Sequence, residues 1–355
     1  MSIRRVIGMD KRVSAITARV AAGEPPTWED CVYLLGFHES SPEATLTRGA
    51  ANDAIRGKTG NTAALFGQIG LELYPCEADC KFCAFGKSHT SFTGKVTLGD
   101  DAIRQKVLDF TQDGDLYCLW LMTMDQYDLD YYLHAVRIAR ETAPPQTLLF
   151  TNIGDTGYEA FAKMKEAGID GAYHILRLGE GVLTSIAPET RLETIRSARA
   201  AGLMIQDCLE PIGPEHTPEE LADHIFRTVS ASFNLAGVMK RTAVPGTGFR
   251  GEISNLRQAQ IVAVNAMALI AADPLPWTLV HEAEYISLAS GANSISAETG
   301  VNPRDVVADT SQGRGLDVSA CRKMLWQAGF SQLALGDGAR VALTPEYIAR
   351  CEAKA

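Results

Sequence analysis

Three cysteines, Cys76, Cys80 and Cys83, stand close together in the stretch LYPCEADCKFCAFGKSH (73–89), with the spacing C-x3-C-x2-C. The chain has eight cysteines in all, and its first residues, MSIRRVIGMDKRVSA, do not form the apolar core of an export signal. In a reducing compartment, clustered thiols more often bind metal or do redox chemistry than form disulfides. We therefore expect a cytoplasmic protein in which this cluster binds a metal.

Two metal centres fit three thiolates from one tight loop. A structural zinc site needs four ligands, and His89, six residues after Cys83, could supply the fourth. A [4Fe–4S] cluster is usually held by four cysteine thiolates. With only three, one iron keeps an open coordination position, and an open position on a metal is the mark of a reactive site.

The segments that must position this loop alternate between short apolar runs and amphipathic helices from about residue 63 onward. Apolar strands that alternate with helices predict a parallel sheet, and eight such units favour a (β/α)8 barrel of the TIM type, with a doubly wound open sheet as the alternative. The candidate strands are 63–73, 116–122, 147–153, 171–176, 203–212, 235–241, 277–282 and 293–298.

The two ends of the chain read as helical. TWED (27–30) is a capping-box pattern, and Ser41 followed by Pro42 is typical of a helix start. We expect an N-terminal helical cap over 1–60, the barrel over 61–335 and a C-terminal tail over 336–355. Because barrel chemistry sits at the carboxyl ends of the strands, the cysteines that follow the first strand lie where a barrel places its active site.

With Phe82 directly before the last cysteine, this motif after the first strand of a β/α chain resembles the radical S-adenosylmethionine (SAM) superfamily. The helical lead-in and the eight units ending in GANSISAE resemble its biotin synthase-like branch, over roughly residues 30 to 335. The resemblance implies that Cys76, Cys80 and Cys83 hold a [4Fe–4S] cluster whose open iron binds SAM. Reductive cleavage of SAM would then give a 5′-deoxyadenosyl radical that abstracts hydrogen from substrate.

The same resemblance implies residues that bind SAM. In HILRLGEGVLTSIAPETRLETI, Arg177, Glu180 and Arg191 match a set that holds the amino and carboxylate ends of SAM. This suits a zwitterion, which needs a guanidinium and an acid. Ile212 and Gly213 correspond to the segment that flanks the adenine. The Gly-rich acidic stretch that many relatives carry after the second strand is missing from LMTMDQYD, where Thr123 is the candidate instead.

A second, sulfur-donating cluster, as in biotin synthase, is not expected. Cys118 matches one of its ligands, but Phe150, Gln206 and His281 stand where the resemblance implies the others, and Cys208 lies two residues beyond Gln206. Sulfur insertion is therefore the alternative reaction rather than the leading one. Polar residues near the strand ends are the candidates for substrate binding: Asn152, His174, Asp207, Lys240, Arg241, His281, Glu282 and Glu298.

The composition of the chain argues against nucleic acid and a membrane as partners. With 43 acidic against 33 basic residues and a net charge of −10, the chain shows no broad basic stripe for nucleic acid. Its longest apolar runs are shorter than a membrane span. We expect a radical SAM enzyme that acts on a small amino-acid-like or carboxylated metabolite, by carbon–carbon rearrangement, bond formation or cleavage, or methylation. A flavodoxin or ferredoxin would be its reductant. A barrel protein with a structural zinc site remains the alternative of another class.

Overall fold

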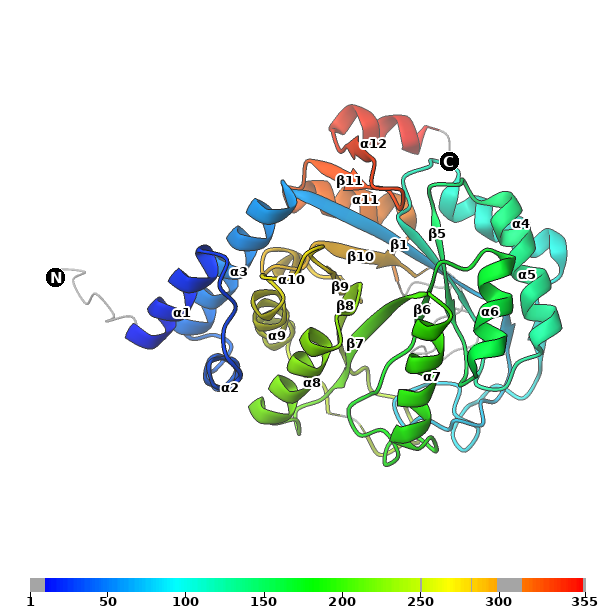
Figure 1. The fold of residues 1–355 in the computed structure, drawn as a ribbon, viewed down its shortest axis with the longest axis horizontal. Helices are drawn as coiled ribbons and strands as arrows, with labels where there is room; N and C mark the ends of the chain where they lie inside the picture. Colours follow the sequence, from blue (N-terminus) through cyan, green and yellow to red (C-terminus); the bar gives the residue numbers. More distant parts are fainter. Residues whose placement is uncertain (1–9, 250, 282, 299–314, 354–355) are drawn as a thin grey trace.

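The computed structural model describes residues 10–249, 251–281, 283–298 and 315–353. Eight parallel strands form a closed barrel, because β10 pairs with β1 as well as with β9 (Figure 1). The predicted (β/α)8 fold is confirmed, and the open-sheet alternative is wrong. In order around the barrel the strands are β1 Thr62–Gly70, β4 Cys118–Met122, β5 Leu148–Asn152, β6 Gly171–Tyr173, β7 Met204–Ile212, β8 Leu235–Lys240, β9 Trp277–Val280 and β10 Ser294–Ala297.

Helices follow the strands and cover the outside of the barrel (Figure 1). Their apolar faces meet the outward-facing side chains of the strands in one continuous core, which is why the strands read as nearly uninterrupted apolar runs. These helices are α4 Asp100–Thr111, α5 Leu129–Thr142, α6 Tyr158–Ala167, α7 Pro188–Ala200, α8 Pro218–Ser230, α9 Asn255–Ala268, the short α10 Tyr285–Leu288 and α11 Val318–Gln327.

The barrel interior is filled by aromatic side chains below the pocket described later. Phe66, Trp120 and Phe150 are at most 1% exposed. The rings of Phe66 and Trp120 stack with their centroids 5.3 Å apart, and the Trp120 indole N–H donates to Gln206 Oε1 over 2.9 Å. The interior is therefore a packed floor rather than a channel.

Among the described residues, three helices precede the barrel: α1 Lys11–Ala21, α2 Trp28–Leu35 and α3 Pro42–Thr59. Both predicted start signals are confirmed, since Thr27 forms a capping box with Asp30 and Ser41 caps α3. Helix α3 ends at Gly60, whose φ of +61° is the left-handed conformation that glycine adopts most readily. The helices pack on one side of the barrel, α2 against α8 and α3 against α9.

The end of the chain closes the amino-terminal side of β1. Strand β11 Gln332–Ala334 extends the sheet beside Thr62 and Ala63, and β12 Arg340–Ala342 pairs antiparallel with it. Helix α12 Pro345–Glu352 follows. Within the residues that the structure describes, no helix is both long and apolar enough to cross a membrane.

Candidate active site at the mouth of the barrel

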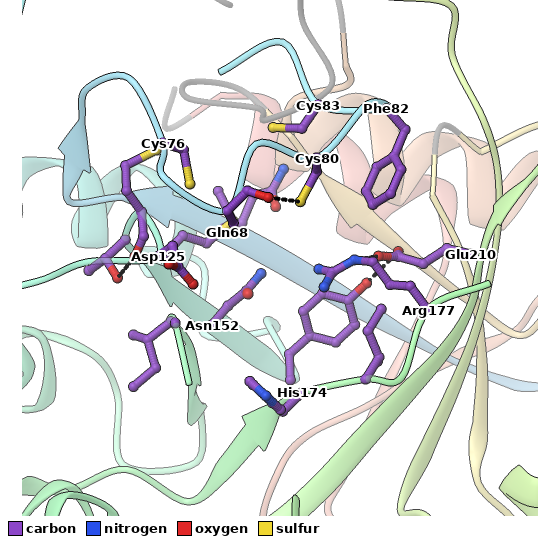
Figure 2. Close-up of a pocket in the computed structure, with 18 of the residues that line it drawn as sticks. Gln68, Cys76, Cys80, Phe82, Cys83, Asp125, Asn152, His174, Arg177 and Glu210 are labelled. Atoms are coloured by element: carbon purple, nitrogen blue, oxygen red, sulfur yellow. Dashed lines mark hydrogen bonds and ion pairs between the residues drawn. The ribbon is translucent and has the colours of Figure 1, made fainter. Parts of the chain in front are cut away.

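One pocket opens at the carboxyl ends of the barrel strands, and every strand contributes to its wall. The contributing residues are Gln68 of β1, Met122 of β4, Asn152 of β5, Tyr173 of β6, Glu210 of β7, Met239 of β8, His281 after β9 and Glu298 after β10. Cys76, Cys80 and Cys83 complete the lining from above. Figure 2 shows these cysteines along one edge of the pocket, with Arg177 and Glu210 to one side and His174 on the far side. The predicted location of the site at this end of the barrel agrees with this geometry.

Backbone hydrogen bonds hold the cysteine loop in place at its base and at its tip. Strands β2 Glu72–Leu73 and β3 Val96–Thr97 form a two-residue antiparallel ladder that closes the segment 74–95. Inside it, the Cys76 N–H donates to Phe85 O over 2.7 Å. At the tip, the Lys81 N–H donates to Leu183 O and the Ser185 N–H to Ala78 O. The loop is thereby held against the segment after β6.

Burial makes the three thiols poor thiolates on their own. It raises the pKa of Cys80 to about 12, and it raises the pKa values of Cys76 and Cys83 as well. Arg177 works in the opposite direction on all three thiols, but its effect is smaller. A metal centre would supply the positive charge that deprotonated thiols need at this depth.

The donor geometry fits an iron–sulfur cluster better than a zinc ion. His89 Nε2 lies 2.7 Å from the carbonyl oxygen of Cys83, and its Nδ1 lies 3.2 Å from the Ser88 hydroxyl, so both ring nitrogens already have partners within the loop. In the described ranges, no group of three His, Cys, Asp or Glu side chains is arranged to hold a single ion. In a multi-iron cluster the thiolates bind separate irons and need not converge on one point.

Beside the cysteines lies a network of two arginines and their carboxylate partners. Arg177 Nε is 3.0 Å from Glu210 Oε1, and Arg191 Nη1 is 3.1 Å from Asp155 Oδ2. Glu180 lies between the two guanidiniums, 3.9 Å from Arg177 Nη1 and 3.5 Å from Arg191 Nε. Although burial opposes it, the pKa of Arg177 is raised by Glu210 and Glu180. The pKa of Arg191 is lowered, first by burial and then by Arg177.

A histidine and an aspartate extend this network across the pocket wall. His174 Nε2 is 2.9 Å from Asp155 Oδ1 and 3.3 Å from Arg191 Nη1. Burial raises the pKa of the Asp155 carboxyl, but the hydrogen bond from His174 and the charge of Arg191 outweigh it and lower that pKa to about 2. Burial lowers the pKa of His174. The cluster thus combines a charged carboxylate with a buried imidazole.

Sequence reasoning missed Asp125, which follows β4 two residues after the predicted Thr123. Asp125 lines the pocket, and its backbone N–H opposes the rise that burial causes in the pKa of the Cys76 thiol. Its carbonyl oxygen packs so close to Gly154 that a Cβ there would lie 1.8 Å away, so only glycine fits at position 154. Burial raises the pKa of the Asp125 carboxyl. A carboxylate one residue beyond Met124 was the available signal.

The structure brings most of the predicted site residues to the pocket. The lining contains Cys76, Cys80, Cys83, Thr123, Asn152, His174, Arg177, Arg191, His281 and Glu298. Glu180 is not in the lining and instead contacts the arginines from behind. Glu282 lies outside the described residues.

Five predicted residues have other partners. Asp207 lies 3.3 Å from His224 Nε2, Lys240 bonds to Asn255, and Arg241 bonds to Glu215 and to the carbonyl oxygen of Gly251. Gly213 makes room for that arginine, since a Cβ there would lie 2.3 Å from Arg241 Nη2, and Ile212 packs in the outer core.

Strand parity explains why Asp207 faces away. Along β7, Gln206 bonds to Trp120 in the barrel interior, Cys208 belongs to the same inner core, and Glu210 lines the pocket. Side chains alternate along a strand, so Asp207 must face the outer helices. Cys118 and Cys208 are fully buried in that inner core, where burial raises the pKa of each thiol.

Comparison with known proteins gives a relative in sequence and relatives in structure. A biotin synthase from Hydrogenobaculum sp. (strain Y04AAS1) is 29% identical over 140 residues, which are 36% of this chain and 41% of that enzyme's length. The chain resembles the biotin synthase-like branch of the radical SAM superfamily. No family model matches it.

Among solved structures, a methylornithine synthase superposes on this chain with a TM-score of 0.75 and 17% identity, covering 89% of this chain and 96% of the other. The [FeFe]-hydrogenase maturase HydG from Carboxydothermus hydrogenoformans gives a TM-score of 0.72 and 15% identity, covering 91% and 79%. At such low identity these two likenesses show the shared barrel fold.

Proposed function

We propose that the chain is a radical SAM enzyme in which Cys76, Cys80 and Cys83 hold a [4Fe–4S] cluster. When bound and reduced, such a cluster supplies the electron that cleaves SAM and releases a hydrogen-abstracting 5′-deoxyadenosyl radical. The observation that carries the proposal is the meeting of a three-cysteine loop with a pair of arginines in one pocket at the carboxyl end of a closed barrel. A three-thiolate set leaves one iron open to a ligand, and the arginines supply charge for that ligand.

The pocket's own side chains would bind and orient SAM. Arg177 and Arg191 offer guanidiniums to its carboxylate, and Asp125 offers a carboxylate to its ammonium group. Glu180, Glu210 and Asp155 would act as positioning residues, since each contacts a guanidinium and so limits its movement. Pre-organised charges of this kind cost little rearrangement when the ligand arrives.

Part of the pocket lining is apolar. Met122, Ile153, Ile175 and Met239 line it together with the polar Gln68 and Asn152. This mixture suits a small metabolite with a few polar groups. We propose hydrogen abstraction from a small amino-acid-like or carboxylated metabolite, followed by carbon–carbon rearrangement, bond formation or cleavage, or methylation, with a flavodoxin or ferredoxin as reductant.

Anaerobic purification and one assay test the proposal. The chain should purify brown, with iron and acid-labile sulfide in near-equal amounts, and should form 5′-deoxyadenosine from SAM when a strong chemical reductant is added. A colourless protein with one bound zinc and no sulfide would overturn the proposal and support the zinc alternative. Heat-treated protein with the same reductant is the control for non-enzymatic SAM breakdown.

A further inference from the structure

A histidine–glutamate pair forms part of the pocket wall away from the arginines. His281 follows β9 and Glu298 follows β10, and the distance between His281 Nδ1 and Glu298 Oε1 is 2.8 Å. The Ser296 hydroxyl donates to the same carboxylate oxygen over 2.8 Å. Both side chains are nearly inaccessible, with 7% of His281 and 1% of Glu298 exposed.

The other ring nitrogen of His281 has no hydrogen-bond partner among the described residues. Nε2 is buried, and among the described residues no protein group hydrogen bonds to it. The ring cannot easily turn to find one, because it stacks on Trp120 at 5.6 Å with an angle of 25° between the planes. Trp120 is itself anchored by its bond to Gln206. A buried polar atom without a partner, on a residue that lines a pocket, indicates a ligand atom at that position.

The hydrogen bond to Glu298 sets what Nε2 can do. Glu298 Oε1 already accepts a hydrogen bond from the Ser296 hydroxyl, so we assign His281 Nδ1 as the donor to the same oxygen, which leaves Nε2 as an acceptor. Nε2 therefore needs a donor from the ligand rather than an acceptor.

The distribution of charge points to the same kind of ligand group. In the closed ring of eight strands, β10 stands four places from β6, so Glu298 lies across the barrel from Arg177, which follows β6. Apart from Arg177 and Arg191, the described lining contains no arginine or lysine. Among the described residues, the His281 side of the pocket therefore offers a ring nitrogen that can accept a hydrogen bond, next to a carboxyl group, which suits a hydroxyl or an ammonium group.

We propose that His281 Nε2 accepts a proton from a hydroxyl or protonated amine of the substrate, with Glu298 as its positioning residue. This rests on the proposed function and narrows its substrate class to metabolites that carry such a donor. In the step, the O–H or N–H bond of the substrate breaks and its electron pair stays on the heteroatom. A new N–H bond forms at Nε2, and Glu298 stabilises the resulting imidazolium. No electron is exchanged, and the proton is returned later in turnover.

The test uses the cluster-loaded full chain labelled with 15N in its seven histidines. Long-range 1H–15N NMR distinguishes a protonated ring nitrogen from a bare one, and the signals that vanish in His281→Gln belong to His281. His134→Gln is the matched control, since His134 is 54% exposed on α5. We expect Nδ1 of His281 to be protonated and Nε2 to be bare at neutral pH. A protonated Nε2 in the resting protein would overturn the proposal.

Three probes of nearly equal size separate donors from acceptors. Isopropanol and isopropylammonium should move the Nε2 resonance, whereas acetone, which only accepts hydrogen bonds, should not. His281→Gln should weaken isopropanol binding about tenfold, the effect of one lost hydrogen bond. A resonance that neither donor moves, or that acetone moves as much, would contradict the substrate class.

Glu298→Gln tests the positioning role. An amide can donate or accept, so this variant should let both ring tautomers of His281 coexist, whereas a residue that only fills space would leave the single tautomer unchanged. Formation of 5′-deoxyadenosine from SAM by the wild-type protein, measured on the same preparation, separates this inference from the proposed function. If the wild-type protein forms none, the proposed function fails whatever the NMR shows. If it forms the product but Nε2 is protonated, only this inference fails.

Discussion

Two groups of buried charges stand at opposite ends of the barrel, and they look alike in composition. At the mouth, Arg177 and Arg191 meet Glu180, Glu210 and Asp155. At the closed end, Arg322 of α11 bonds to Asp115 over 2.6 Å and to Asp113 over 2.8 Å, just before β4. The Arg322 side chain is 1% exposed.

The two groups differ in whether their arginines border a cavity. Arg322 is enclosed by its two carboxylates and the Tyr347 ring, and none of these residues lines the pocket. Arg177 and Arg191 border the cavity and face the cysteines. Buried ion pairs are by themselves weak evidence of function, and the cavity is what separates a binding group from a structural one.

We expect the largest effect from a substitution of a cysteine in the pocket. Cys80→Ala should reduce iron content and abolish detectable 5′-deoxyadenosine formation, because two thiolates cannot hold the cluster. The matched control is Cys31→Ala, a fully buried cysteine of α2 that is far from the pocket in the fold. It should keep its iron and its product. Equal product from Cys80→Ala and wild type would remove the basis of the comparison.

Substitution of Arg322, at the amino-terminal end of the barrel, should lower stability rather than SAM binding. Arg322→Met leaves Asp115 buried without its cation, so the free energy of unfolding should fall by about 3–5 kcal/mol. Urea denaturation monitored by circular dichroism measures this. SAM binding should be unchanged at temperatures where the variant is folded, and a loss of SAM affinity would show that the two ends are not independent.

Arg177→Met gives the opposite pattern. Losing a hydrogen bond to a charged ligand costs about 1.5–3 kcal/mol, so the Kd for SAM should rise by about 10- to 150-fold. The loss of stability should be smaller than for Arg322→Met, because water in the pocket can reach the carboxylate left behind. Calorimetric titration with SAM gives the Kd, and an unchanged value would place the SAM carboxylate elsewhere.

The two ends should also differ in their response to acid. Burial lowers the pKa of His174. As the pH falls, this histidine therefore binds a proton in the unfolded chain before it does so in the native protein. Stability should therefore fall as pH drops below the unfolded histidine value of about 6.5. His174→Gln should flatten that part of the profile. Arg322→Met should not, since the pKa of Arg322 is raised and the group stays charged throughout.

The smallest effect concerns two ion pairs on the cysteine loop. Lys87 and Glu77 are half exposed, so Lys87→Ala should change stability by less than about 0.5 kcal/mol. Lys95 pairs with Glu72, whose side chain is 1% exposed, and Lys95→Ala should cost about 1–3 kcal/mol because that carboxylate stays buried. Thermal unfolding of both variants ranks them, and the reverse order would contradict the burial argument.

Much of the fold follows from sequence because local signals and tertiary packing agree. Strands that are buried on both faces must be apolar throughout, which made all eight visible, and Thr27 and Ser41 mark helix starts by their own hydrogen bonds. The cysteine spacing needs only a loop after the first strand. These features depend on neighbours in sequence.

The contacts across the pocket depend on barrel closure, which no local pattern encodes. Asp155, His174 and Arg191 come from three different segments and meet only in the folded barrel. Asp207 lies within β7 and Arg241 follows β8, yet both turn to outer partners because of strand parity and the path of the following loops. The alternation of side chains along each strand therefore predicts which polar residues face the pocket better than the presence of a polar residue near a strand end does.

The most direct test of the central claim is electron paramagnetic resonance of the reduced protein with and without SAM. If SAM binds the open iron of a three-cysteine cluster, adding it should change the spectrum of the wild type. In Arg177→Met the change should require a higher SAM concentration. A reduced cluster whose spectrum SAM leaves unaltered, or a protein with no such signal at all, would contradict the account.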